Sequence, residues 1–167
     1  MDLSDFPQQI GSYQICEVLQ QSARSILYLG EHRDQKRQAV IKVAAHSLWQ
    51  EGETQVGLLR EAEVMKLTHH PGIVSLYETG KWERGVYLAM ERVIGCSLKE
   101  RLQTWPIPLQ EVFSTVLQVA YALYHLHAYG VIHRDIKPQN LLLSSEGGVK
   151  LVDFGIVRFL SEKNADP

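Results

Sequence analysis

The fold is decided by the stretch HRDIKPQN at residues 133–140, which is followed thirteen residues after Asn140 by DFG at residues 153–155. The segments LLLSS and VKLV lie between the two strings and are typical of short strands. A lone Asp beside an Arg is most often part of a surface ion pair, and a lone DFG is most often a turn. The order and spacing of the two strings together carry the inference, because neither is specific alone.

In this order and spacing the strings resemble the catalytic loop and the metal-binding loop of the eukaryotic-like (Hanks-type) serine/threonine protein kinase family. The resemblance covers residues 13–167 and implies transfer of the γ-phosphoryl group of ATP to Ser or Thr hydroxyls of a protein substrate. It implies that Asp135 accepts the proton of the incoming hydroxyl and that Lys137 reaches the transferred phosphate. Asn140 and Asp153 carry oxygen ligands of the kind that Mg²⁺ prefers. ATP and Mg²⁺ are therefore the expected cofactors.

A second part of the site is expected upstream. Residues 39–43, AVIKV, form an apolar run with one cation, which predicts a buried strand carrying a functional charge. Residues 58–67 have the apolar spacing of an amphipathic helix that ends before HHPG at residues 69–72. By the resemblance, Lys42 holds the α- and β-phosphates and pairs with Glu61 of this helix, while Glu63 is rotated towards solvent.

The adenine site is expected at the end of GVYLAMERV, residues 85–93, which predicts a strand bounded by Gly. This end resembles the family's hinge segment, whose backbone holds the base. The resemblance implies that the Glu91 carbonyl and the Val93 amide and carbonyl meet the base edge, and that Met90 guards the pocket behind it. The other expected nucleotide contacts are apolar: Leu19, Leu27, Val40 and Leu142.

The stretch LQQSARSILY at residues 19–28 departs from the family. The family has three glycines between its first two strands, so that backbone amides can close over the phosphates. Gln20, Ser22 and Ser25 stand at those positions here, if residues 13–15 and 27–31 are the two strands. We expect left-handed geometry at these residues to cost about 1–2 kcal/mol and to weaken nucleotide binding.

The resemblance implies an α+β, bilobal, protein-kinase-like fold with three regions. Residues 1–12 are an N-terminal extension, and residues 13–93 are a complete N-lobe and hinge, with an antiparallel sheet and one helix. Residues 94–167 are a partial helical C-lobe, in which the apolar spacing predicts a short helix after Gly95 and a long helix over residues 109–129. The resemblance also implies that His133 and Phe154 are buried packing residues of a hydrophobic column that joins the two lobes.

No APE motif follows the DFG string, and the sequence ends at Pro167. We therefore expect a chain truncated in the activation segment. Its long helix would expose apolar surface, and a partner or a missing C-terminal segment would complete the C-lobe.

Composition adds few constraints. The chain has 167 residues, a net charge of −2 and only two cysteines. The charge gives no reason to expect nucleic acid, and the cysteines do not suggest a disulfide framework or a zinc site. No signal peptide or apolar run long enough to span a bilayer is apparent, so the expected location is the cytoplasm and no membrane segment is expected.

Two alternatives belong to other functional classes. The first is a catalytically impaired pseudokinase or interaction scaffold, which the missing glycines and the early end favour, whereas the intact Lys42, Glu61, Asp135, Asn140 and Asp153 argue against it. The second is a small-molecule phosphotransferase of the related aminoglycoside-kinase kind, which Arg134 and the Lys137-Pro138 pair disfavour.

Overall fold

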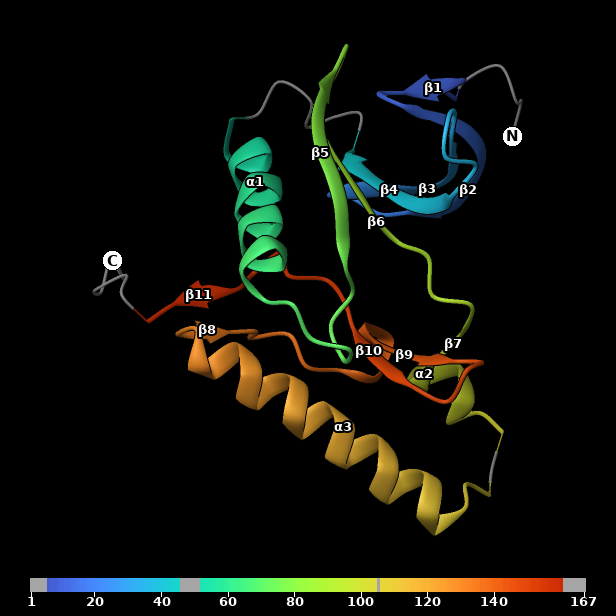
Figure 1. The fold of residues 1–167 in the computed structure, drawn as a ribbon, viewed down its shortest axis with the longest axis vertical. Coiled ribbons are helices and arrows are strands. Elements are labelled where there is room, and N and C mark those ends of the chain that lie inside the picture. Colours follow the sequence, from blue (N-terminus) through green and yellow to red (C-terminus); the bar gives the residue numbers. More distant parts are fainter. Residues whose placement is uncertain (1–5, 46–51, 105, 161–167) are drawn as a thin grey trace. The chain divides into compact units, whose positions relative to one another are not determined.

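The computed structural model describes residues 6–45, 52–104 and 106–160, which divide into two compact units. The first unit comprises residues 1–62 and 76–92, and the second comprises residues 63–75 and 93–167. The first contains a sheet and most of one helix, and the second contains the remaining helices and two small sheets (Figure 1). The α+β fold class expected from the sequence is confirmed.

The first unit is built on a six-stranded antiparallel sheet with the strand order β1-β2-β3-β4-β6-β5. Its strands are β1 (Gln9–Ile10), β2 (Tyr13–Gln21), β3 (Ser25–His32), β4 (Gln38–Ala44), β5 (Leu76–Trp82) and β6 (Gly85–Glu91). Figure 1 shows the N-terminal strands curling round on one another. β1 lies within the segment expected as an extension and pairs with β2, Ile10 standing opposite Tyr13.

The two faces of this sheet differ in chemistry because side chains alternate along each strand. In β4, Ala39, Ile41 and Val43 point into the apolar core, so Val40 and Lys42 lie on the other face. The core is a cluster of buried side chains from five strands: Ile10, Tyr13, Ile26, Tyr28, Ala39, Ile41, Val43, Tyr87 and Ala89. A central strand can carry Lys42 because the alternation keeps it out of this core.

Helix α1 (Gly52–Leu67) begins six residues before the stretch whose spacing predicted it. It is attached to the sheet of the first unit by a hydrogen bond from the Val86 N–H to Gln55 Oε1, 2.7 Å long. At its end, Thr68 donates its backbone N–H and its hydroxyl to the Val64 carbonyl, at 3.0 and 2.8 Å. These two bonds satisfy a terminal carbonyl and define the end of the helix.

In its described residues the second unit contains the end of α1 and one 3₁₀-helix (Pro138–Asn140), together with two complete α-helices and five short strands. They are β7 (Gly95–Ser97), α2 (Leu98–Arg101), α3 (Leu109–Ala128), β8 (Val131–Ile132), β9 (Leu141–Ser144), β10 (Val149–Leu151) and β11 (Arg158–Phe159). The strands form a three-stranded sheet, β10-β9-β7, and a pair, β11-β8. Ser97 caps α2 with a reciprocal capping box to Glu100, which stabilises so short a helix.

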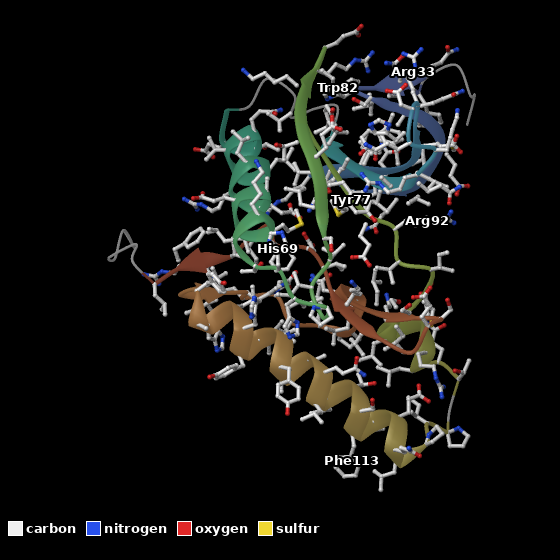
Figure 2. All side chains as sticks on the ribbon, viewed as in Figure 1. Arg33, His69, Tyr77, Trp82, Arg92 and Phe113 are labelled. Atoms are coloured by element: carbon white, nitrogen blue, oxygen red, sulfur yellow. The ribbon has the colours of Figure 1, made fainter. Side chains whose placement is uncertain are left out.

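Helix α3 presents much of its apolar surface to solvent, as expected from the sequence. Phe113 is 66% exposed and Tyr124 is 75% exposed, and Figure 2 shows Phe113 pointing away from the unit. On the other side, Gln118 Oε1 accepts a 3.0 Å hydrogen bond from the Val149 N–H, which holds β10 against the helix. Gly130, at φ 70°, follows the helix in left-handed geometry. No helix in the described part of the chain has the length and apolar character needed to cross a membrane.

Candidate active site

The first unit contains a buried ion pair between β4 and α1. Lys42 Nζ lies 2.8 Å from Glu61 Oε2 and 3.0 Å from Glu61 Oε1, and the two residues are 8% and 2% exposed. Glu63 is exposed. A buried ammonium is tolerated only when it is paired, so Glu61 is the group that keeps Lys42 in this position. The structure thus brings together the two charged residues that the sequence singled out upstream.

Apolar side chains border Lys42 on the same face of the sheet. Leu27 of β3 stands opposite Lys42, and Met90 of β6 stands opposite Val40. Directly opposed residues share a face, as do residues two apart on one strand. Leu27, Val40 and Met90 therefore form an apolar surface beside the ammonium group.

The remaining expected nucleotide contacts are more scattered. Leu19 of β2 is 44% exposed and falls at an irregular step in the β2–β3 pairing. Glu91 ends β6, opposite Ala39. Val93 and Leu142 belong to the second unit, where Leu142 pairs with Ser97 and Lys150.

The turn between β2 and β3 corrects one expectation. Among the described residues other than glycine, positive φ occurs at Lys36, Arg134 and Asp153 only. The expected left-handed strain at Gln20, Ser22 and Ser25 is therefore wrong. Its physical reason is that both strands run further than predicted, to Gln21 and from Ser25. Gln20 and Ser25 therefore lie in extended strands, and only Ser22 lies in the short turn between them.

The second unit holds a hydrogen-bonded cluster around Asp135. Its Oδ2 accepts a hydrogen bond from Lys137 Nζ at 2.6 Å and one from Asn140 Nδ2 at 2.9 Å. The hydrogen bond from Lys137 lowers the pKa of the Asp135 carboxyl below its usual value, and Asn140 lowers it further. Both of these contacts are made by Oδ2 and not by Oδ1. At neutral pH this carboxylate is an ionised proton acceptor held in place.

The His133 side chain, in the HRDIKPQN segment, makes contacts with residues in and next to the DFG segment. It is 1% exposed, its Nδ1 accepts the Asp135 N–H at 3.3 Å, and its Nε2 lies 3.2 Å from the Val152 carbonyl oxygen. Because Nδ1 accepts, the neutral ring carries its proton on Nε2 and donates it to Val152. Burial lowers the pKa of His133, which favours this neutral form. The ring also packs against Phe154, with centroids 5.0 Å apart.

The oxygen ligands expected for a metal lie at one end of the β9–β10 hairpin. Leu141 stands opposite Leu151, and the Val152 N–H donates to the Asn140 carbonyl at 3.0 Å, so Asn140 and Asp153 leave the hairpin at the same end. Asp153 has φ 64°, a conformation that costs a non-glycine residue energy and that clusters at functional sites.

These residues fit Mg²⁺. Both N–H groups of Asn140 are donated to Asp135, which leaves the amide oxygen as the atom available to a cation. Among residues 6–45, 52–104 and 106–160 there is no group of three or more His, Cys, Asp and Glu side chains arranged for a metal. Mg²⁺ typically takes one or two carboxylates from the protein and completes its shell with water and substrate phosphates. An amide and a carboxylate oxygen suit such a site.

The sequence missed two roles that the structure reveals. His133 was expected only to pack, but it hydrogen-bonds on both ring nitrogens. Ser22 was noted as a replaced glycine, but the sequence did not predict that its hydroxyl closes the β2–β3 turn. The SARS sequence at residues 22–25 carried the signal for the second role, because Ser hydroxyls commonly bond to the backbone of their own turn.

Comparison with known proteins identifies the class: the chain belongs to the protein kinase domain family, whose model matches residues 13–166. It is 34% identical over 152 residues to the serine/threonine-protein kinase PrkC of Bacillus subtilis, covering 90% of this chain and 24% of the relative. It is 35% identical over 152 residues to the probable serine/threonine-protein kinase PknB of Lactococcus lactis, with the same coverage. A mouse relative, sperm motility kinase Z, is 33% identical over 150 residues, which are 89% of this chain and 29% of the relative. The chain thus spans about a quarter of the length of the curated relatives it matches.

Proposed function

We propose that this chain carries the catalytic residues of an ATP- and Mg²⁺-dependent serine/threonine protein kinase. The observation that carries the proposal is the cluster in the second unit, in which Lys137 and Asn140 hold one carboxylate oxygen of Asp135. It is supported by the names of two relatives, the serine/threonine-protein kinase PrkC and the probable serine/threonine-protein kinase PknB.

In the proposed reaction, the hydroxyl oxygen of a substrate Ser or Thr forms a bond to the γ-phosphorus of ATP. The bond from that phosphorus to the β–γ bridging oxygen breaks, and ADP leaves. Asp135 orients the hydroxyl and takes its proton on Oδ1. Lys137 neutralises charge on the transferred phosphoryl group, and its bond to Oδ2 keeps both side chains in position.

Binding of the nucleotide is assigned to other residues. Lys42, fixed by Glu61, would hold the α- and β-phosphates as a buried point charge. Leu27, Val40 and Met90 would pack against adenine, with the backbone of Glu91 and Val93 at the base edge and Leu19 and Leu142 as further apolar contacts. Asn140 and Asp153 would hold Mg²⁺, which when bound would supply positive charge to offset the charge on the group being transferred.

The test is phosphoryl transfer with a defined product. The chain is incubated with γ-labelled ATP, Mg²⁺ and a generic acceptor protein, and the labelled amino acid is identified. We expect phosphoserine or phosphothreonine, lost in Asp135→Ala and retained in the matched control Asp34→Ala, whose carboxylate lies on an exposed loop. Phosphotyrosine, or a label that Asp135→Ala leaves intact, would refute the proposal.

A second candidate is a pseudokinase or interaction scaffold, and the tight β2–β3 turn favours it because that turn lacks the glycines of the family. The two candidates differ in a simple measurement. A scaffold that binds nucleotide would show a rise in melting temperature with ATP and no labelled product, whereas a kinase would show both.

The natural setting is also a proposal. A protein substrate follows from the relatives, and we propose that the kinase acts in the cytoplasm. Cys16 and Cys96 support this location, because both are free thiols on the surface of the described structure, as is usual in a reducing compartment.

A further inference from the structure

Most backbone N–H groups of the turn between β2 and β3 are hydrogen-bonded to acceptors within the turn itself. The Ser22 N–H donates to the Ser25 carbonyl at 2.9 Å. The Ser22 hydroxyl accepts the N–H of Ser25 at 3.0 Å and the N–H of Arg24 at 3.3 Å, and it donates to the Ser25 carbonyl at 2.9 Å. Three of the four N–H groups of residues 22–25 are therefore satisfied inside the turn, two of them by one hydroxyl.

The strand register places this turn close to Lys42. Leu27 stands opposite Lys42, and Ser25, two residues nearer the turn, stands opposite Ala44. The Ala45 N–H also donates to the Arg24 carbonyl at 2.9 Å, which pins the turn to the end of β4. The turn therefore lies close in the sheet to the lysine that is proposed to hold the phosphates, within the same unit.

We infer that Ser22 limits how tightly this protein binds the triphosphate of ATP, by occupying N–H groups that would otherwise be free to bind phosphate oxygens. This inference rests on the proposed function. The N–H groups that the Ser22 hydroxyl occupies do not bind phosphate, so binding of the triphosphate depends on Lys42. The physical basis is that a backbone N–H cannot serve two strong acceptors at once, and the turn hydroxyl is already in place before the ligand arrives.

The change Ser22→Ala tests this without dismantling the turn. It removes the hydroxyl and releases the N–H groups of Arg24 and Ser25, but the backbone bond from Ser22 to Ser25 remains. A charge-assisted hydrogen bond from one released N–H to a phosphate corresponds to about a tenfold gain in affinity, reduced by the cost of reordering the turn. We expect Ser22→Ala to bind MgATP about three- to tenfold more tightly.

Ser25→Ala is the matched control. The Ser25 hydroxyl lies 3.4 Å from the Ser22 hydroxyl and binds neither N–H group, so its removal leaves both N–H groups occupied. Adenosine, which has no phosphates, is the matched ligand, and its affinity should be the same for all three proteins. Dissociation constants are measured by calorimetry, and the exchange rates of the Arg24 and Ser25 amide protons are measured by NMR.

The account predicts that Ser22→Ala improves the ratio of MgATP to adenosine affinity and accelerates exchange of the two amides, and that Ser25→Ala does neither. Binding of MgATP that is unchanged or weaker in Ser22→Ala overturns the inference and leaves the proposed function standing. Failure of all three proteins to bind either MgATP or adenosine overturns both.

Discussion

At the scale of single residues, the donors around Asp135 determine how the proposed activity should depend on pH. The hydrogen bond from Lys137 lowers the pKa of Asp135, so the carboxylate stays ionised well into the acid range. The acid limb of the rate profile reports protonation of such a base. The pH at which the acid limb falls should therefore depend on the hydrogen bond from Lys137.

Lys137→Met should move the acid limb of kcat/KM to higher pH, because the pKa of Asp135 returns towards its ordinary value of about 3.9. The rate at neutral pH should also fall, since the ammonium no longer faces the phosphoryl group. A pH series of initial rates measures both effects. The control is Lys36→Met, which removes an exposed lysine 3.7 Å from Glu31. An acid limb that stays in place or moves to lower pH would contradict this assignment.

His133 should make the fold sensitive to mild acid. Burial holds the pKa of His133 below the unfolded value of about 6.5. The unfolded chain therefore binds more protons, and the stability contributed by the neutral ring is present above that value and lost as the pH falls towards the folded pKa. We expect the melting temperature to fall between about pH 7.5 and 5.5.

His133→Phe should reduce this pH dependence, because the ring can no longer take up a proton. A residual slope should remain from His70, whose pKa is lowered by burial and then by His125. Exposed His69 supplies the control, and His69→Gln should leave the slope unchanged. Melting curves in a pH series give the result, and an identical slope in His133→Phe would show that His133 does not control the acid sensitivity.

The sequence predicted the paired charges of Lys42 and Glu61 but did not predict the hydrogen bonds of His133. Lys42 is predictable because a lone cation in an apolar strand needs a partner, and the resemblance to the kinase family selected Glu61 as that partner. The hydrogen bonds of His133 could not be predicted, because the Val152 carbonyl reaches it only after the β9–β10 hairpin has formed.

At the scale of elements, the ion pair of Lys42 and Glu61 joins α1 to the sheet of the first unit. Glu61→Ala should destabilise the chain by about 3–5 kcal/mol, because it removes the carboxylate that is hydrogen-bonded to a buried ammonium. Replacing both residues by apolar ones, Lys42→Met with Glu61→Leu, should restore most of the loss while activity stays absent. The measurement is urea unfolding of the single and double variants.

The exposed neighbour Glu63 is the control for this cycle, and Glu63→Ala should change the free energy of unfolding by less than about 0.5 kcal/mol. If Glu61→Ala were as mild as Glu63→Ala, the ion pair would not hold the helix.

Two glycines should respond in opposite directions to replacement by alanine. Gly57 lies in α1, where an added Cβ meets no atom within 4 Å, so Gly57→Ala should stabilise the chain by about 0.5–1 kcal/mol. Gly95 begins β7 at φ 155°, and an added Cβ would overlap the Leu143 carbonyl oxygen. Gly95→Ala should therefore cost about 1–3 kcal/mol. Urea unfolding measures both, and equal effects would contradict the described packing.

The elements differ in how well the sequence predicted them. Helix α3 was predicted within a residue at its end, because its apolar spacing and Gly130 are both local signals. The start of α1 and the lengths of β2 and β3 were not predicted correctly, because they depend on contacts made elsewhere in the unit. Val86 binds Gln55 in the first turn of α1, and β3 extends to Ser25 because Ala44 pairs with it.

At the scale of the whole molecule, the two units divide the proposed chemistry between them. The first carries Lys42, Glu61 and the apolar surface assigned to adenine, and the second carries Asp135, Lys137, Asn140 and Asp153. The family could be predicted from two short strings, because their order and spacing are more specific than any single element. The exposed face of α3 could also be predicted from sequence.

The central claim is that Asp135 accepts the proton of a protein hydroxyl during phosphoryl transfer from ATP. Its most direct test is a single-turnover measurement with Asp135→Asn at saturating MgATP. The account predicts that MgATP binds with nearly unchanged affinity and that transfer slows by about 10²- to 10⁴-fold, because the amide cannot take the proton. Transfer at the wild-type rate in Asp135→Asn would contradict it.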